Sequence, residues 1–193
     1  MAEFDWTAFL GEWSRELIAS QEIAAQLPPE VKAAGWLGYA GASDEQIAHA
    51  EARLGRSLPP SYRAFLKCSN GWRNTGFFID RLWSTDDLEW FRVRHQEWIS
   101  DWNLGEAHHA TTNPGQPTGG GSYEGAALPF TLEISDVGDS AIYLLNPLAE
   151  SSDGEWQAWF FSNWNPGAVR YRSFQQMIEN ERKRFLYVRD HKR

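Results

Sequence analysis

The feature that most constrains the fold is a series of β-type runs in the second half of the chain, separated by turn-forming residues. The runs are 128-LPFTLEI-134, 140-SAIYLLN-146, 155-EWQAWFFS-162 and 168-AVRYR-172. The connections between them are short and rich in Asp, Gly, Asn and Pro, and short connections of this kind join neighbouring strands into an antiparallel meander. The sequence therefore predicts a largely antiparallel sheet.

Helical patterns precede and follow this meander. Residues 5–26 place apolar side chains three or four positions apart, which predicts an opening helix that stops at Pro28-Pro29. A second helix is predicted over residues 43–55, because Ser43 forms a capping pattern with the glutamine three positions later. Ser173 starts the same pattern before a final amphipathic helix. Helices first, strands next and one last helix indicate an α+β fold.

The length of 193 residues suits a single domain of ordinary size. We expect a helical extension over residues 1–35 that packs on an α+β domain over residues 36–193. In this domain a largely antiparallel sheet is flanked by helices. Residues 103–125 are rich in Gly, Pro, Thr and Asn and lack periodicity, which predicts a long surface loop.

The stretch 55-GRSLPPSYRAFLKCSNGW-72 combines several helix signals. Pro59-Pro60 can begin a helix, because the missing N–H of proline has no partner in a first turn. Asn70-Gly71 supplies residue types that tolerate positive φ at a helix end, after which Trp72 can fold back. Cys68 is interpreted as a small buried hydrophobe rather than a nucleophile.

Farther along, Phe77-Phe78-Ile79 predicts a short strand, and the polar residues 84–87 predict the start of a fourth helix that runs to about Trp102. One stripe of this helix would carry the apolar side chains, while a second face would carry Trp90 and carboxylates. That second face is either buried or an exposed aromatic and acidic contact surface. The candidate partner-binding residues are Asp86, Asp87, Glu89, Trp90, Glu97 and Asp101.

Charge is distributed unevenly. The formal net charge is −8, and between Arg94 and Arg170 there are ten Asp and Glu but no Lys or Arg. This acidic stretch is either a solvated face or a surface that meets a basic partner. Direct binding of nucleic acid is disfavoured, since phosphates would be repelled.

Cysteine usage and hydropathy indicate the compartment. A single Cys cannot form an internal disulfide, the N-terminus lacks a signal-peptide pattern, and no apolar run is long enough to cross a membrane. We expect a cytoplasmic protein that does not enter membranes. No pattern indicates an oligomeric state.

Motifs for catalysis and cofactor binding are weak. His108-His109 lack further ligands, residues 136–139 lack the rest of a calcium loop, and the glycines of 119–125 open no helix. Carboxylates beside Trp83 and Trp90 suit carbohydrate binding, but a helix start attracts acidic residues for dipole reasons alone. We therefore expect no catalytic residue, no metal and no cofactor.

One ordered set of residues carries a family resemblance. The set resembles the SUKH superfamily, which includes yeast cell-wall-synthesis regulators and many bacterial immunity proteins; it runs Ile47, Glu51, Leu54-Gly55, Leu58-Pro59, Tyr62, Phe65-Leu66 and Asn70-Gly71-Trp72. Residues 137–145 look like the later strand region of that family, and Ser173-Phe174 look like the start of its last helix. The resemblance covers roughly residues 36 to 188.

The resemblance implies a non-catalytic α+β domain that neutralises a cognate toxin, with nucleases prominent among such toxins. A basic nuclease would suit the acidic stretch as a partner. Two alternatives remain at this point. One is an interaction scaffold in a cell-wall or signalling pathway, and the other is a carbohydrate-binding protein.

Overall fold

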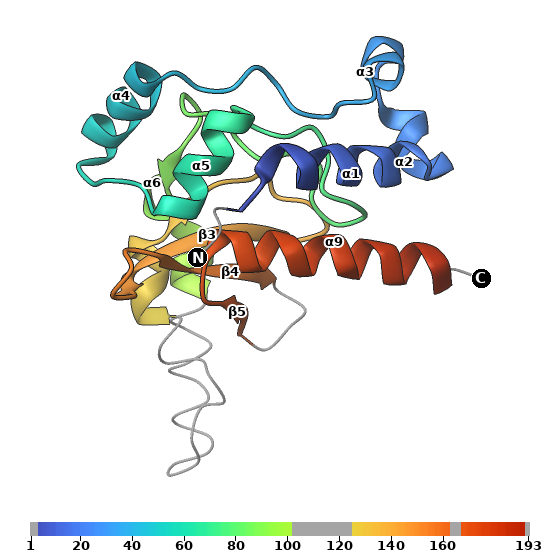
Figure 1. Ribbon diagram of the computed structural model, residues 1–193. Coiled ribbons are helices and arrows are strands. Elements are labelled where there is room, and N and C mark those ends of the chain that lie inside the picture. Colours follow the sequence, from blue (N-terminus) through green and yellow to red (C-terminus); the bar gives the residue numbers. More distant parts are fainter. Residues whose placement is uncertain (1–3, 102–124, 163–166, 192–193) are drawn as a thin grey trace, which may run out of the picture.

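The computed structural model describes residues 4–101, 125–162 and 167–191 (Figure 1). The helices are α1 (Trp6–Ile18), α2 (Gln21–Gln26), α3 (Pro29–Ala34), α4 (Asp44–Leu54), α5 (Pro60–Cys68), α6 (Phe91–Arg94), the 3-10 helix η1 (Leu128–Phe130) and α9 (Phe174–His191). The strands are β1 (Glu89–Trp90), β2 (Leu132–Glu133), β3 (Ala141–Glu150), β4 (Trp156–Ser162) and β5 (Ala168–Tyr171). Residues 96–101 are also helical.

The strands of the described residues form a five-stranded sheet in the order β1-β2-β3-β4-β5, in which every neighbouring pair is antiparallel. A tight turn leads into β3: Asp139 and Ser140 have φ of 47° and 56°, and Gly138 and Ala141 exchange two backbone hydrogen bonds around them. Positive φ at both central residues is the geometry that matches the twist of paired strands. The α+β fold and the antiparallel meander are confirmed, although residues 128–130 of the first β-type run form the 3-10 helix η1.

Alternation along the central strands divides the apolar side chains between two faces of the sheet. Tyr143 and Phe160 enter the larger cluster, which also holds the buried faces of α1, α5 and α9. Leu144 and Trp159 point to the opposite face and pack with Phe91 in a smaller cluster. Successive side chains in a strand point to opposite faces, so the sheet is covered on both.

The opening helix α1 and the last helix α9 lie side by side (Figure 1). Their contact includes Arg182 of α9, whose guanidinium donates to Glu12 at 3.0 Å and to Glu16 at 2.5 Å and 2.7 Å. Trp13 of α1 stacks on Trp72 at 5.7 Å between ring centroids, and both are fully buried. The N-terminal segment therefore shares one core with the rest of the chain.

Local signals explain most of the helix boundaries. Ser43 and the glutamine three positions later form the predicted capping box of α4, and Gly55 ends that helix in the left-handed region. At α5, Pro59 occupies the cap position without offering a side-chain acceptor. The carboxylate of Glu155 replaces it, because it accepts from both the N–H and the hydroxyl of Ser61 at 2.8 Å and 2.7 Å.

Several local predictions were wrong. The segment 5–26 is divided into α1 and α2, since Ser20 takes an extended cap conformation, and Pro29 begins α3 instead of only ending a helix. Residues 77–79 form no strand, because Thr75 closes a loop onto the carbonyl of Ile79. The end of α5 is Ser69 in extended conformation, although Gly71 does have a φ of 101°.

The predicted fourth helix is also wrong in its extent. Residues 85–87 form a turn, Glu89 and Trp90 form β1, and α6 ends before His95. The predicted loop 103–125 and Trp102 lie outside the described residues, except for the loop's last position. Within the described residues, no helix is both long and apolar enough to span a bilayer.

Candidate functional site

The turn that precedes β1 is held in place by side chains from α4 and from the end of α5. Asn70 pairs with Thr85 twice, accepting from its N–H at 2.8 Å and donating to its hydroxyl at 3.2 Å. Arg53 donates to the carbonyl of Thr85 at 2.9 Å and to that of Leu88 at 2.6 Å. The turn therefore presents Asp86 to solvent on a fixed backbone.

The free edge of β1 is already occupied by the protein itself. The N–H of Phe91 donates to Thr131 on the β2 side, so the N–H of Trp90 faces away from the sheet. That outward N–H donates to the side chain of Glu89 at 2.8 Å. The indole N–H of Trp90 reaches the carbonyl of Leu54 at 3.3 Å, which ties α4 to this edge.

Beside this turn, Asp136 collects the hydrogen bonds of two neighbouring side chains. The Arg81 guanidinium donates to both carboxylate oxygens at 3.0 Å and 3.1 Å, and the Trp83 indole donates at 2.6 Å. Partial burial opposes ionisation, but these donors prevail and hold the pKa of Asp136 below its ordinary value. Asp87 lies near the same arginine at 3.9 Å and accepts from the hydroxyl of Ser84 at 2.8 Å.

A partly buried contact between a carboxylate and an imidazole lies under the helical residues that follow α6. Glu133 of β2 is 1% exposed, and one of its carboxylate oxygens lies 2.9 Å from Nε2 of His95. Its other oxygen is buried and has no hydrogen-bond partner among the described residues. The ring of His95 stacks on Phe91 at 4.5 Å between centroids. This contact holds the start of the 96–101 helix against the sheet.

The six predicted partner-binding residues fall into two groups. Asp86, Asp87, Glu89 and Trp90 adjoin one another in the turn and β1, where Asp86 is exposed and the other three are half-buried. Glu97 and Asp101 are exposed on the later helical residues. No hydrogen bond or ion pair among the described residues joins the two groups. They do not share one helix face, because the helix that would carry both does not form.

Most described carboxylates of the acidic stretch have partners within the protein. They are Glu133 with His95, Asp136 with Arg81, Glu150 with Arg56, Asp153 with Arg172 and Glu155 with Ser61. Asp136, Glu150 and Asp153 lie beside arginines, and such carboxylates contribute little outward field, because the neighbouring cation cancels it at a distance. The negative charge offered to a partner therefore comes from fewer residues than the sequence count indicates.

Two exposed apolar side chains lie next to the predicted residues and were missed by sequence reasoning. Val93 of α6 is 58% exposed and Phe130 of η1 is 49% exposed. Arg92 joins their elements, since its guanidinium donates to the carbonyl of Pro129 at 3.2 Å and lies 5.4 Å from the centroid of the Trp90 ring. Phe130 belongs to a run that predicts burial, and Val93 stands alone between two arginines, so the sequence pattern did not indicate a shared apolar surface.

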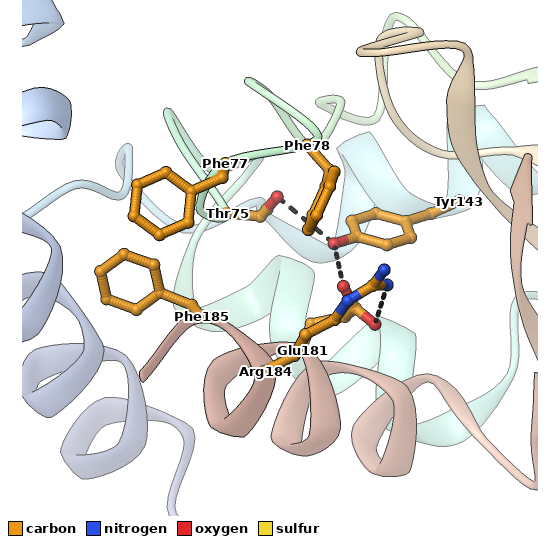
Figure 2. A pocket seen from close by; sticks show the side chains of 7 residues that line it. All are labelled: Thr75, Phe77, Phe78, Tyr143, Glu181, Arg184 and Phe185. Atoms are coloured by element: carbon orange, nitrogen blue, oxygen red, sulfur yellow. Dashed lines mark hydrogen bonds and ion pairs between the residues drawn. The ribbon is translucent and has the colours of Figure 1, made fainter. Parts of the chain in front are cut away.

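A second cluster of titratable groups lies inside the molecule, between α9 and the sheet (Figure 2). Glu181 accepts from the hydroxyls of Tyr143 at 3.0 Å and Tyr171 at 3.3 Å, and Arg184 lies 3.8 Å away. Burial raises the pKa of Glu181 and raises the pKa of Tyr171 to about 12. The adjoining cavity, of about 10 Å³, has room for roughly one water.

Other candidate chemistry finds little geometric support in the described part of the chain. No three His, Cys, Asp or Glu side chains there are grouped so that they could hold a metal ion. Cys68 is half-buried, and its sulfur lies 3.5 Å from the hydroxyl of Thr7. The pair His108-His109 lies outside the described residues. The cavity beside Glu181 is too small for a sugar ring.

Comparison with known proteins identifies one family. The model of the SMI1 / KNR4 family (SUKH-1) matches residues 41–180, which is most of the chain. The matched region runs from the connector before α4 to the first half of α9, and it includes β1, α6 and the whole sheet. No curated protein matches the chain.

Proposed function

Because the chain belongs to the SMI1 / KNR4 family (SUKH-1), we propose that it is an immunity protein that binds a cognate bacterial toxin domain and neutralises it. Neutralisation occurs by protein–protein contact and involves no catalytic step. Family membership carries this proposal, because the superfamily resembled by the motif over residues 47–72 includes many immunity proteins. The partner resides in the same cytoplasmic compartment.

The contact surface of the proposal is the segment 86–101. Asp86, Glu97 and Asp101 are exposed, and no described cation pairs with them through a side-chain ion pair. Unpaired carboxylates on one surface attract a basic partner over several ångströms and raise the rate of encounter. A nuclease that binds phosphates with Lys and Arg offers such a surface.

The half-buried members have a second role. Asp87, Glu89 and Trp90 each make hydrogen bonds within the protein, so they shape the turn and β1 as well as lining the surface. Their replacement would alter folding and binding together. Tests of binding are therefore cleaner at the three exposed carboxylates.

Co-expression with toxin genes from the same gene neighbourhood tests the proposal. Bacteria that produce the toxin domain should grow when this protein is produced with it, and should die when it is absent. Combined charge reversal of Asp86, Glu97 and Asp101 to Lys should reduce the protection. Glu30→Lys is the control, because Glu30 is an exposed carboxylate on α3, and α3 lies far from α6 in Figure 1.

The outcomes separate this proposal from its rival. If every neighbouring toxin remains lethal at full production of a folded immunity candidate, the neutralising function is wrong. Recovery of several endogenous partners, with no toxin among them, would instead indicate an interaction scaffold.

A further inference from the structure

We infer that the toxin partner docks on an apolar patch formed by Val93, Phe130 and the stem of Arg92, with the carboxylates of segment 86–101 at its rim. This inference rests on the proposed function and specifies its interface. The occupant is a basic protein surface that carries a protruding apolar side chain. The patch supplies most of the binding free energy, and the rim carboxylates supply the rate of association.

Two apolar side chains are exposed on short elements, each of which also buries an apolar side chain. In α6, Phe91 is fully buried while Val93 is 58% exposed, and in η1, Leu128 is fully buried while Phe130 is 49% exposed. Each short element thus contributes one residue to the smaller cluster and one to the surface. Single exposed apolar residues are ordinary, but two on adjoining elements form a patch that a partner can cover.

Hydrogen bonds hold the two elements of the patch together, and the patch includes an arginine beside an aromatic ring. The N–H of Phe91 donates to Thr131 at 2.9 Å, and Arg92 donates to Pro129, so α6 and η1 are held side by side. The Arg92 guanidinium also lies over the Trp90 ring. Tryptophan, tyrosine and arginine are the residues that most often dominate binding energy at the centre of an interface, so Arg92 beside Trp90 suits that position.

Docking by addition of a partner strand to the edge of β1 is excluded, because the backbone groups there already have partners. A partner strand could extend the sheet at β1 only by pairing with its outward-facing backbone groups. The N–H of Trp90 is occupied by Glu89, and the carbonyl of Leu88 by Arg53. Strand addition would break both contacts, so the partner must bind through side chains at the surface.

The charged side chains around the patch favour a basic partner. The segment 86–101 holds five carboxylates, at Asp86, Asp87, Glu89, Glu97 and Asp101, and two arginines, at Arg92 and Arg94. Arg94 lies over the Trp83 ring at 4.4 Å and donates to the carbonyl of Asp87 at 3.2 Å. The surplus of negative charge around the patch complements Lys and Arg on the partner, which is the polar rim of a typical interface.

The patch is also held rigidly before binding. His95 and Glu133 connect the residue after α6 to β2, and Phe91 fills the cluster beneath it. Little conformational entropy is then lost when the partner arrives. This rigidity favours a stable docking surface over a segment that orders only on binding.

The experiment measures association and dissociation rates between this protein and the neighbouring toxin domain, made inactive by substitution of its catalytic residue. Val93→Ala with Phe130→Ala should weaken Kd at least about tenfold, chiefly through faster dissociation. Leu148→Ala with Val137→Ala is the matched control, because these side chains are 57% and 44% exposed elsewhere. The control should change Kd less than about twofold.

A second set of variants tests the division of roles. Asp86→Asn, Glu97→Gln and Asp101→Asn together should slow association and reduce its salt dependence, with little change in dissociation. Thermal unfolding of each variant checks that the fold is intact. If the wild type binds the toxin domain and the Val93 and Phe130 variant binds equally well, the patch is wrong and the function stands. If the folded wild type binds no neighbouring toxin domain, the proposed function fails, and the patch proposal fails with it.

Discussion

The carboxylate of Glu181 accepts a hydrogen bond from the hydroxyl of Tyr143, with 3.0 Å between the oxygens, although both side chains are buried. This contact joins the middle of α9 to the centre of the sheet. The pKa of Glu181 lies above its ordinary value of 4.5, because burial disfavours the charged form. Glu181 should therefore contribute a pH-dependent part of the stability of the fold.

Glu181→Gln should remove that dependence. With a raised pKa in the folded state, the stabilisation from this group is fully present below pH 4.5 and is lost as the pH rises through the folded value. The wild type should therefore lose stability relative to the variant as the pH rises above 4.5, by about 1.4 kcal/mol for each tenfold difference between the acid dissociation constants of the folded and unfolded states.

Urea unfolding at several pH values measures this difference. Glu179→Gln, on the same helix, is the control and should leave the pH profile of the wild type unchanged. Parallel profiles for the wild type and Glu181→Gln would contradict the assignment.

Asp136→Asn should have the opposite pH signature. Its pKa is lowered, so its stabilisation is present above the ordinary value of 3.8 and is lost as the pH falls toward the folded value. The carboxylate is 40% exposed, and solvent screening limits the expected loss at neutral pH to about 1 kcal/mol. Denaturation at pH 7 and at progressively lower pH should show that the difference in unfolding free energy between the wild type and Asp136→Asn becomes smaller. Asp80→Asn, at an exposed neighbouring position, is the control and should unfold with the same free energy as the wild type at pH 7.

Glu155→Ala should destabilise the protein by about 1 to 2 kcal/mol, because it removes both acceptors for Ser61 at the start of α5. The comparison is Glu150→Ala, which removes a carboxylate from an exposed pair with Arg56 and should cost less than about 0.5 kcal/mol. Guanidinium unfolding of both variants measures the two losses. Equal losses would show that Glu155 does not act as the missing cap.

Gly71→Val should damage folding, since φ is 101° and an added Cβ would lie 3.1 Å from the carbonyl oxygen of Leu82. We expect a loss of about 2 kcal/mol or more, read from the thermal midpoint.

Cys68→Ala should leave toxin binding nearly intact. A Cys68→Ala protein that melts like the wild type but no longer binds its partner would show that Cys68 belongs to the interface.

The strands of the meander could be predicted from sequence because their information is local. β-type runs alternate with turn residues from Leu128 to Tyr171, and the sheet follows their order. The capping box at Ser43 is local in the same sense. Such elements form where nearby residues alone decide the backbone conformation.

The segment 84–102 could not be predicted because distant residues decide its structure. Arg53 and Asn70 hold the turn at Thr85, and β2 pairs with Glu89 and Trp90. The polar start at Ser84 looks like a helix cap when these partners are unknown. Tertiary hydrogen bonds compete with helix propensity here, and they prevail.

The candidate site was predicted only in part for the same reason. The composition of segment 86–101 selected acidic and aromatic residues as candidates for partner binding, but their exposure depends on packing. Glu133 is a carboxylate within the acidic stretch, yet it is buried under His95. Phe130 lies in an apolar run, yet half of it faces solvent. The pattern of charge and hydropathy along the chain does not reveal that this carboxylate is buried or that this aromatic side chain is exposed.

The two apolar clusters described above are separated by the sheet, and the patch of Val93 and Phe130 is supported by the smaller one. Residues of the proposed toxin-binding surface can therefore diversify while the larger cluster keeps the protein folded. A library randomised at Val93, Arg92 and Phe130 should yield mostly folded members. Selection from it against a different toxin would then retarget immunity without redesign of the scaffold.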